Sequence, residues 1–252
     1  MDDRSKPPEI SVVIPAFNEQ NRIHETIRRV EAFLCLKQCD WEIIVSNDGS
    51  TDRTAGIVEA LVKARADEKL RLLTALKNSG KGMAVRRGVL AARGDYVLVT
   101  DVDLSAPIKE MDKLIKVLKE GYDIATGCRA LREEGCDVQQ SFKRWLGGRI
   151  FNFFVGAVLM KGFLDTQCGF KCFTRETAQA LFSAQKLDGF AFDVEVLYLA
   201  KQKGYRIKEV PVMWKEGGES KVRFFRDSFR MLKDLLYLRR YYSTRLSSRK
   251  FL

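Results

Sequence analysis

The chain has 252 residues, of which 46% are hydrophobic and 31% charged, and its formal net charge is +11. This length suits one large α/β domain or a domain with appendages, and the composition excludes a disordered chain. The excess of positive charge is concentrated in residues 222–252, which carry nine Lys and Arg against two Asp. Such a basic segment indicates an acidic partner, either nucleic acid or an anionic membrane surface.

Three further classes of protein are disfavoured. The six cysteines form no C-x-x-C pair and the chain has one histidine, so we expect no structural zinc site. The longest apolar stretch, residues 150–160, is flanked by Arg149 and Lys161 and is too short to span a bilayer. Residues 1–8 are polar and charged, unlike a signal peptide, so we expect buried free thiols in a reducing cytoplasm.

In the first half of the chain, short apolar runs alternate with segments whose apolar residues recur at helical spacing. The runs predict strands at 10–14, 41–45, 70–74 and 96–100. The helical spacing predicts helices at 23–34, around 57–62 and at 84–92, the second capped by Ser50 or Thr51. This alternation predicts βαβ units, right-handed crossovers and a mostly parallel sheet.

The second half is less regular. We expect strands at 122–126, 171–173 and 205–212, and a helix at 190–203. The polar residues 129–140 read as a loop next to the site, and the sequence leaves open whether it is a mobile lid. Residues 145–163 form an apolar, aromatic segment that includes Trp145, Phe151, Phe153, Phe154 and Phe163.

Polar clusters follow three of the predicted strands, at 15–19, 47–50 and 101–105. In open α/β sheets ligands bind beyond the carboxyl ends of the strands, so the three clusters should converge on one edge. Asp101-Val102-Asp103 offers two carboxylates at a strand end, and hard oxygen ligands suit Mg²⁺ or Mn²⁺. Alone this pattern is weak, because surface acidic pairs are usually only solvated; its position raises its significance.

The other clusters also have purely structural interpretations. Residues 15–19 could be an ordinary turn before a helix, and residues 47–52 a turn with a helix cap. Asp48 could instead accept a hydrogen bond from a nucleobase imide. Residues 78–82, Asn-Ser-Gly-Lys-Gly, offer flexible backbone and a cation near phosphates, but they lack the spacing of a Walker A loop.

In this order and spacing the clusters resemble the inverting GT-A glycosyltransferases of the family that includes polyprenyl-phosphate glycosyltransferases. The matching text is VVIPAFNE (12–19), NDGSTD (47–52), N-x-GKG (78–82) and D-x-D (101–103). Two later segments, DTQCGFK (165–171) and FDVE (192–195), look like the dolichyl-phosphate β-glucosyltransferase branch in particular. The resemblance covers roughly residues 9 to 240. It implies a GT-A-type, Rossmann-like catalytic domain at 1–220, with a donor-binding half at 9–105 and an acceptor-binding half at 106–220, and a basic amphipathic helical extension at 221–252.

The resemblance also implies roles for single residues. The residues expected to bind the donor are Pro15, Phe17, Glu19, Asp48, Lys81 and Asp101. The residues expected to bind the metal are Asp101 and Asp103. The acceptor phosphate is expected at Arg129, Lys143, Arg144 and Lys171, and Gln167 faces the sugar or the acceptor. The residues expected to act in catalysis are Asp101, Asp103, Arg129 and Gln167. Where mannose synthases often carry Gln as a third metal contact this chain has Ser105, which leaves water to complete the shell.

The acceptor decides whether a general base is needed. Transfer to a sugar hydroxyl normally requires a carboxylate base, for which Asp165 and Asp193 are the candidates. A phosphate monoester, with a second pKa of about 6, is already anionic at neutral pH and needs cations more than a base. We therefore expect a lipid-phosphate acceptor, with glucose from UDP-glucose as the transferred sugar. GDP-mannose as donor and a sugar hydroxyl as acceptor remain alternatives.

The partners follow from the same features. Residues 224–237 interleave bulky apolar and basic side chains, the pattern of a basic amphipathic helix at a membrane surface; the apolar ones are Phe224, Phe225, Phe229, Leu232, Leu235, Leu236 and Tyr237. With residues 145–163 this segment predicts a peripheral membrane protein on the cytoplasmic side, although both could pack within the protein. No nucleic-acid-binding signature appears, so we expect no nucleic acid. The sequence leaves the oligomeric state open.

Overall fold

The computed structural model describes residues 7–217 and 224–248, with side chains for all of these except 143–144, 224–228 and 243–248. The strands are β1 (Ile10–Ala16), β2 (Trp41–Asn47), β3 (Leu70–Thr74), β4 (Tyr96–Val99), β5 (Ile124–Cys128), β6 (Val138–Gln139), β7 (Lys171–Thr174), β8 (Ile207–Pro211) and β9 (Trp214–Lys215). The helices are α1 (Ile23–Leu34), α2 (Thr54–Lys63), α3 (Lys81–Leu90), α4 (Met111–Lys119), α5 (Phe142–Val158), α6 (Arg175–Ala184), α7 (Phe192–Gln202) and α8 (Phe224–Ser248), with a 3₁₀ turn η2 (Ile108–Glu110).

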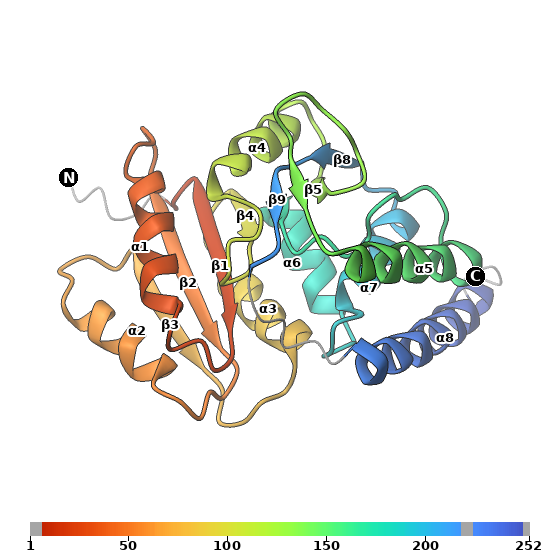
Figure 1. Cartoon of the computed structure of the whole chain (residues 1–252), viewed down its shortest axis with the longest axis horizontal. Helices are drawn as coiled ribbons and strands as arrows, with labels where there is room; N and C mark the ends of the chain where they lie inside the picture. Colours follow the sequence, from red (N-terminus) through yellow and green to blue (C-terminus); the bar gives the residue numbers. More distant parts are fainter. Residues whose placement is uncertain (1–6, 218–223, 249–252) are drawn as a thin grey trace.

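A seven-stranded sheet in the order β3-β2-β1-β4-β7-β5-β8 forms the centre of the molecule (Figure 1). β1 runs parallel to β2 and β4, with Ile10 opposite both Trp41 and Tyr96. β7 is antiparallel to its neighbours β4 and β5, whereas β8 is parallel to β5. The predicted mostly parallel α/β sheet is confirmed. β6 and β9 pair separately, so the predicted loop at 129–140 contains a short strand.

Helices cover both faces of this sheet, which explains why every residue of β1 and β2 is buried. Successive side chains of a strand point to opposite faces. Val12 therefore joins the core packed by α1 and α4, whereas Val13 joins the core packed by α3, α6 and α7. The helical spacing read from α1 is confirmed, since Ile27 and Leu34 lie in that first core.

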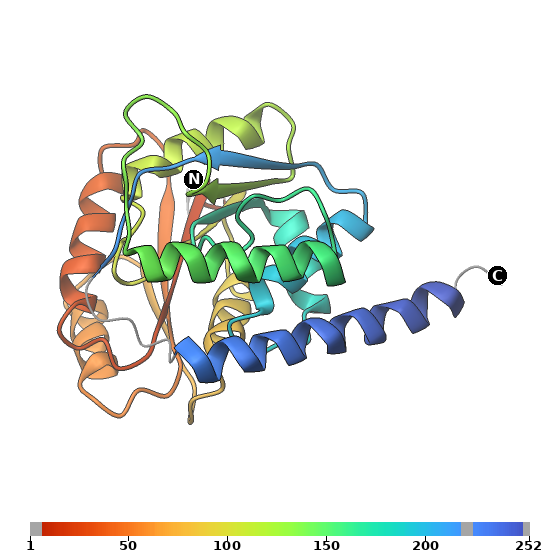
Figure 2. The same ribbon diagram turned by 45° about the vertical axis from the view of Figure 1, so that its right-hand side comes forward.

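The helices α5 and α8 run side by side along one flank of the molecule (Figures 1 and 2). α8 buries Met231, Leu235 and Leu238 in the same core as α7. The Tyr242 hydroxyl at its far end donates to the buried carboxylate of Glu195 in α7 at 2.8 Å. The predicted C-terminal helix is thus present, and part of its apolar face packs on its own domain. Among the described helices none is long and apolar enough to cross a membrane.

Several predicted boundaries shift for identifiable reasons. The helix expected at 84–92 begins at Lys81, because Gly80 takes up a left-handed φ of 110° and lets the chain turn directly into α3. The cap predicted at Ser50 or Thr51 is wrong. α2 begins at Thr54, whose N–H donates to the Asp52 carboxylate at 2.9 Å. The helices α4, α5 and α6 were not predicted.

Candidate active site

The loops that follow β1 and β2 are tied together by hydrogen bonds. The backbone N–H of Asn18 donates to the Ser50 hydroxyl at 2.9 Å, and the Asn18 side-chain oxygen accepts from the Thr51 N–H at 2.8 Å. The Glu19 N–H donates to the Thr54 hydroxyl at 2.7 Å. Asn18 has a φ of 52°, a left-handed conformation that asparagine adopts more readily than most residues. The predicted convergence of the first two polar clusters is confirmed.

Asp48 links these loops to the segment before α3. It is 2% exposed, and its Oδ2 accepts the backbone N–H groups of Ser79 at 3.1 Å and Gly80 at 2.7 Å. Its buried Oδ1 has no hydrogen-bond partner among the described residues, and the nearest cation, Arg87, is 3.6 Å away. A buried carboxylate oxygen without a donor is costly, so this atom has the capacity to accept an N–H group from a ligand.

Lys81, in the first turn of α3, connects this segment to the end of β4. Its ammonium group lies 2.6 Å from Asp101 Oδ1. Burial opposes the charge on Lys81, but Asp101 and Asp193 outweigh it and raise the pKa of the amine. Gly80 has no room for a side chain, since a Cβ there would lie 2.4 Å from the carbonyl oxygen of Asp188. The backbone therefore fixes where Lys81 stands relative to Asp101.

The two carboxylates after β4 occupy a narrow turn. Asp103 accepts from the Ser105 N–H at 3.0 Å and from the Ser105 hydroxyl at 2.7 Å. Two glycines lie directly against the carboxylates: a Cβ on Gly169 would lie 2.4 Å from Asp101 Oδ2, and one on Gly217 would lie 2.7 Å from Asp103 Oδ2. Within residues 7–217 and 224–248 no group of three or more acidic, cysteine or histidine side chains gathers as a complete metal cage. Two carboxylates and a hydroxyl fit a Mg²⁺ or Mn²⁺ ion that takes its other ligands from substrate phosphates and water.

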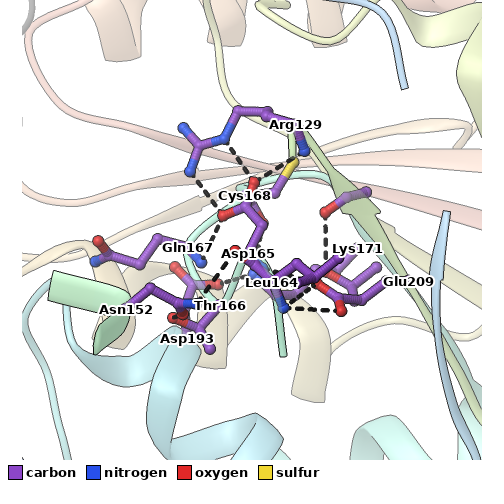
Figure 3. A network of polar contacts seen from close by, with 12 residues as sticks. Arg129, Asn152, Leu164, Asp165, Thr166, Gln167, Cys168, Lys171, Asp193 and Glu209 are labelled. Atoms are coloured by element: carbon purple, nitrogen blue, oxygen red, sulfur yellow. Dashed lines mark hydrogen bonds and ion pairs between the residues drawn. The ribbon is translucent and has the colours of Figure 1, made fainter. Parts of the chain in front are cut away.

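A second polar cluster lies between β5 and the segment before β7, and Figure 3 shows it with Arg129 facing Asp165. The guanidinium donates twice to the carboxylate, at 2.7 and 2.8 Å, and the Arg129 N–H donates to it at 3.0 Å. Burial works against the charge of Asp165, but Arg129 more than compensates and holds the pKa of that carboxyl below its usual value. Arg129 also stacks over Trp214, 5.5 Å from the ring centre.

Lys171 and Asp193 form a deeper pair. The Lys171 ammonium is 2.6 Å from Asp193 Oδ1 and 2.5 Å from the carbonyl oxygen of Cys168, and its side chain is 3% exposed. Two of the three N–H donors of this ammonium are therefore engaged, and burial leaves little access to the third. Asp165 and Asp193, the two candidates for a general base, are thus each paired with a cation.

Comparisons with known proteins identify the family of this chain and its fold. The family model described as "Glycosyl transferase family 2" matches residues 11–182. A protein of Dictyostelium discoideum named dolichyl-phosphate beta-glucosyltransferase is 38% identical over 240 residues, covering 91% of this chain and 73% of its own. A human protein of the same name is 36% identical over 251 residues, covering 95% and 78%.

The chain belongs to glycosyl transferase family 2. Its fold is that of the solved glucosyl-3-phosphoglycerate synthase from Mycobacterium tuberculosis, in a complex with Mn²⁺, UDP-glucose and phosphoglyceric acid. The TM-score is 0.69 at 20% identity, over 92% of this chain and 79% of that one. This likeness confirms the GT-A-type architecture.

The structure describes the side chains of four of the remaining predicted site residues. Pro15 is buried in β1, and Phe17 and Glu19 are half-buried in the loop after it. Gln167 donates its N–H to Asp165 Oδ1 at 3.2 Å, and its side-chain amide lies 3.9 Å from the sulfur of Met231 in α8. Lys143 and Arg144 lie in α5, outside the described side chains.

Two residues of this cluster escaped the sequence analysis. Glu209 in β8 accepts the N–H groups of Leu164 and Asp165, the latter at 2.8 Å. Asn152 in α5 bonds the same segment from the other side (Figure 3). Neither residue belongs to a motif or a strand-end cluster, so the sequence carries no signal that could have singled them out.

Proposed function

We propose that this protein transfers glucose from UDP-glucose to a dolichyl or other polyprenyl phosphate, with inversion at the sugar. The observation that carries the proposal is the shared name of its relatives. Dolichyl-phosphate beta-glucosyltransferases of several eukaryotes are 34–38% identical to it over most of its length. The site geometry supports the same chemistry, because a buried carboxylate with an unpaired oxygen, a cation and a pair of carboxylates lie along one edge.

The donor is proposed to lie across the ends of β1, β2 and β4. Asp48 Oδ1, buried and without a donor, is suited to accept the imide N–H of uracil. Pro15, Phe17 and Glu19 are proposed to line the nucleoside pocket. Lys81 is proposed to lie near the diphosphate, since it stands between the Asp48 loop and Asp101.

Asp101 and Asp103 are proposed to hold Mg²⁺ or Mn²⁺ together with diphosphate oxygens, with the Ser105 hydroxyl behind Asp103. The ion would supply Lewis-acid neutralisation of the charge that develops on the departing diphosphate. Lys81 now pairs with Asp101, so it is placed to exchange that carboxylate for a phosphate oxygen when the donor binds.

On the acceptor side, a phosphate needs cations rather than a base. Arg129, Lys143, Arg144 and Lys171 are the proposed cations, and Gln167 is proposed to face the sugar or the acceptor. The engagement of Asp165 by Arg129 favours this reading over a hydroxyl acceptor. Both oxygens of Asp165 are occupied and its pKa is lowered, which makes it a poor proton acceptor.

We further propose that the exposed apolar side chains of α5 and α8 contact the membrane, on its cytoplasmic side. This α5–α8 surface consists of Phe142, Trp145, Leu146, Ile150, Phe153 and Phe154 on α5 and Phe229, Leu236 and Tyr237 on α8. Exposed basic residues accompany it: Arg149, Lys161, Arg230, Lys233 and Arg239. Each such cation near an anionic bilayer contributes about 1 kcal/mol. Leu235, predicted as part of this contact, is instead buried in the core, and Phe224 and Phe225 lie outside the described side chains.

The test is transfer of labelled sugar to dolichyl phosphate in vesicles, with UDP-glucose, GDP-mannose and UDP-N-acetylglucosamine run in parallel. We expect label in the organic-extractable product from UDP-glucose, its loss with a chelator, and its return with Mn²⁺ or Mg²⁺. Asp101→Ala should abolish transfer. Label from GDP-mannose alone would favour the mannosyltransferase alternative, and no lipid-linked product from any donor would reject the proposal.

The membrane contact is tested separately by flotation with vesicles containing anionic lipid at low and high salt. We expect binding at low salt that weakens at high salt, because part of the attraction is electrostatic. The variant Phe153→Ala should weaken binding further, since this side chain is 71% exposed. Absence of binding at low salt would refute the contact.

A further inference from the structure

Asn152 is the only residue of α5 with an amide or hydroxyl side chain. The remainder of this helix is apolar, glycine or basic, and its outer face carries the aromatic part of the α5–α8 surface. Asn152 is half-buried and points the other way, toward the segment that precedes β7 (Figure 3). A neutral polar side chain in such a helix is expected to have a specific partner.

The partners are the backbone just before Asp165 and the side chain of the residue just after it. The Asn152 amide nitrogen donates to the carbonyl oxygens of Phe163 at 2.8 Å and Leu164 at 3.1 Å. Its oxygen accepts from the Thr166 hydroxyl at 3.0 Å. One side chain therefore uses its amide nitrogen and its oxygen to hold three residues that flank Asp165, two before it and one after it.

Those positions carry the acceptor side of the site. Between them Asp165 holds Arg129 with two charged hydrogen bonds, and Glu209 fixes the N–H of Asp165 from the sheet at 2.8 Å. The next residue, Gln167, contacts Met231 of α8. The segment 163–167 is thus fastened to the rigid sheet on one side and to the two helices of the α5–α8 surface on the other.

We propose that Asn152 is a positioning residue for the acceptor, which joins the membrane-facing helix α5 to the Arg129–Asp165 pair. Since a lipid phosphate is held at a fixed depth by its own chain, the cation that meets it must stand at a matching height above the lipid surface. The three hydrogen bonds of Asn152 set that height, because they fix the segment to the helix that rests on the lipid. The inference rests on the proposed lipid-phosphate acceptor.

The first arm of the test compares Asn152→Ala with the wild type in glucose transfer from UDP-glucose to dolichyl phosphate in anionic vesicles. We expect the KM for the lipid phosphate to rise about 10- to 100-fold, the range expected when a reacting group is displaced by about 1 Å. The affinity for UDP, measured by calorimetry, and vesicle binding should stay within about twofold of the wild type, because Asn152 contacts neither ligand. Thr166→Val, which removes one of the three hydrogen bonds, should act in the same direction with a smaller effect and serves if Asn152→Ala does not fold.

The matched control is Gly156→Ala, one turn further along α5, where an added Cβ has nothing within 4 Å. It should leave transfer and vesicle binding unchanged. An unchanged KM for lipid phosphate in Asn152→Ala would overturn the proposal. A loss of UDP affinity in parallel with the rise in KM would also overturn it, because that pattern indicates general destabilisation.

A second arm does not depend on activity. Hydrogen exchange of the Leu164 and Asp165 amides should slow when anionic vesicles are added to the wild type, and should not change in Asn152→Ala. The same response in both proteins would refute the coupling. If the wild type transferred no glucose to dolichyl phosphate, the proposed function would fail, and the exchange measurement would still decide whether Asn152 joins α5 to this segment.

Discussion

Replacing Asp165 by Asn isolates the charge that Arg129 neutralises while keeping the shape of the side chain. The pair is largely shielded from water, with 8% of the Asp165 side chain and 19% of the Arg129 side chain exposed. Asn keeps one oxygen for the guanidinium, but it places an amide group where the second charged hydrogen bond was.

The expected cost follows from this burial. Removing one charge of a buried pair destabilises a protein by about 3–5 kcal/mol, because the partner is left without compensation. Arg129 keeps one hydrogen bond and its stacking on Trp214, so we expect the lower end, about 3 kcal/mol. For a chain of this size that corresponds to a fall of roughly 6–12 °C in melting temperature.

The destabilisation of Asp165→Asn should depend on pH. The folded pKa of Asp165 lies below its usual value of 3.8, so its contribution to stability is fully present above that pH and is lost as the pH falls through the folded value. In urea unfolding, the free energy of unfolding of Asp165→Asn should lie below that of the wild type by the full amount at pH 7 and pH 5. This difference should shrink below about pH 3.8. A gap under about 1 kcal/mol at pH 7, or one that persists unchanged to pH 3, would refute the reasoning.

The matched control is Glu25→Gln. Glu25 pairs with Arg28 at a similar distance, 2.8 Å, but both side chains are more than half exposed. Solvent and salt screen such a pair, so this variant should have the same free energy of unfolding as the wild type. A loss comparable to that of Asp165→Asn would mean that burial is not the cause.

Other variants probe the proposed donor side and the core. Gly169→Ala should reduce glucose transfer at least about 100-fold without unfolding the protein, because its Cβ would displace Asp101. Gly156→Ala is the control. Near-normal transfer by Gly169→Ala would contradict the packing argument. Asp48→Asn should weaken UDP binding about 10-fold in calorimetry, since an amide N–H₂ then faces the imide donor; unchanged affinity would place the base elsewhere. With a thiol reagent at pH 8, exposed Cys35 should react fastest and half-exposed Cys39 next in the native protein. The four buried cysteines should react slowly; burial raises the pKa of Cys172, for example, to about 12. Six fast thiols would mean that the core is open.

The sequence by itself determined the part of the site that we propose binds the donor. Each of its clusters follows a strand, and parallel strands end at the same edge, so local order along the chain was enough to bring Asp48 and Asp101 to one edge. The spacing of apolar residues likewise predicted α1 and the buried strands, because a repeat of 3.6 or of two residues reports which side of an element is covered.

The tertiary structure alone decided the part of the site that we propose binds the acceptor. Arg129 and Asp165 meet because β7 inserts antiparallel between β4 and β5, a pairing that no local pattern encodes. The same holds for Glu209, which lies 44 residues from Asp165, and for Asn152, since nothing in the sequence shows that α5 folds back on the segment that follows it. For α8, helical spacing identified an apolar face but could not say what covers it. Only the packed structure divides it into Leu235, which is buried in the core, and Leu236, which is exposed.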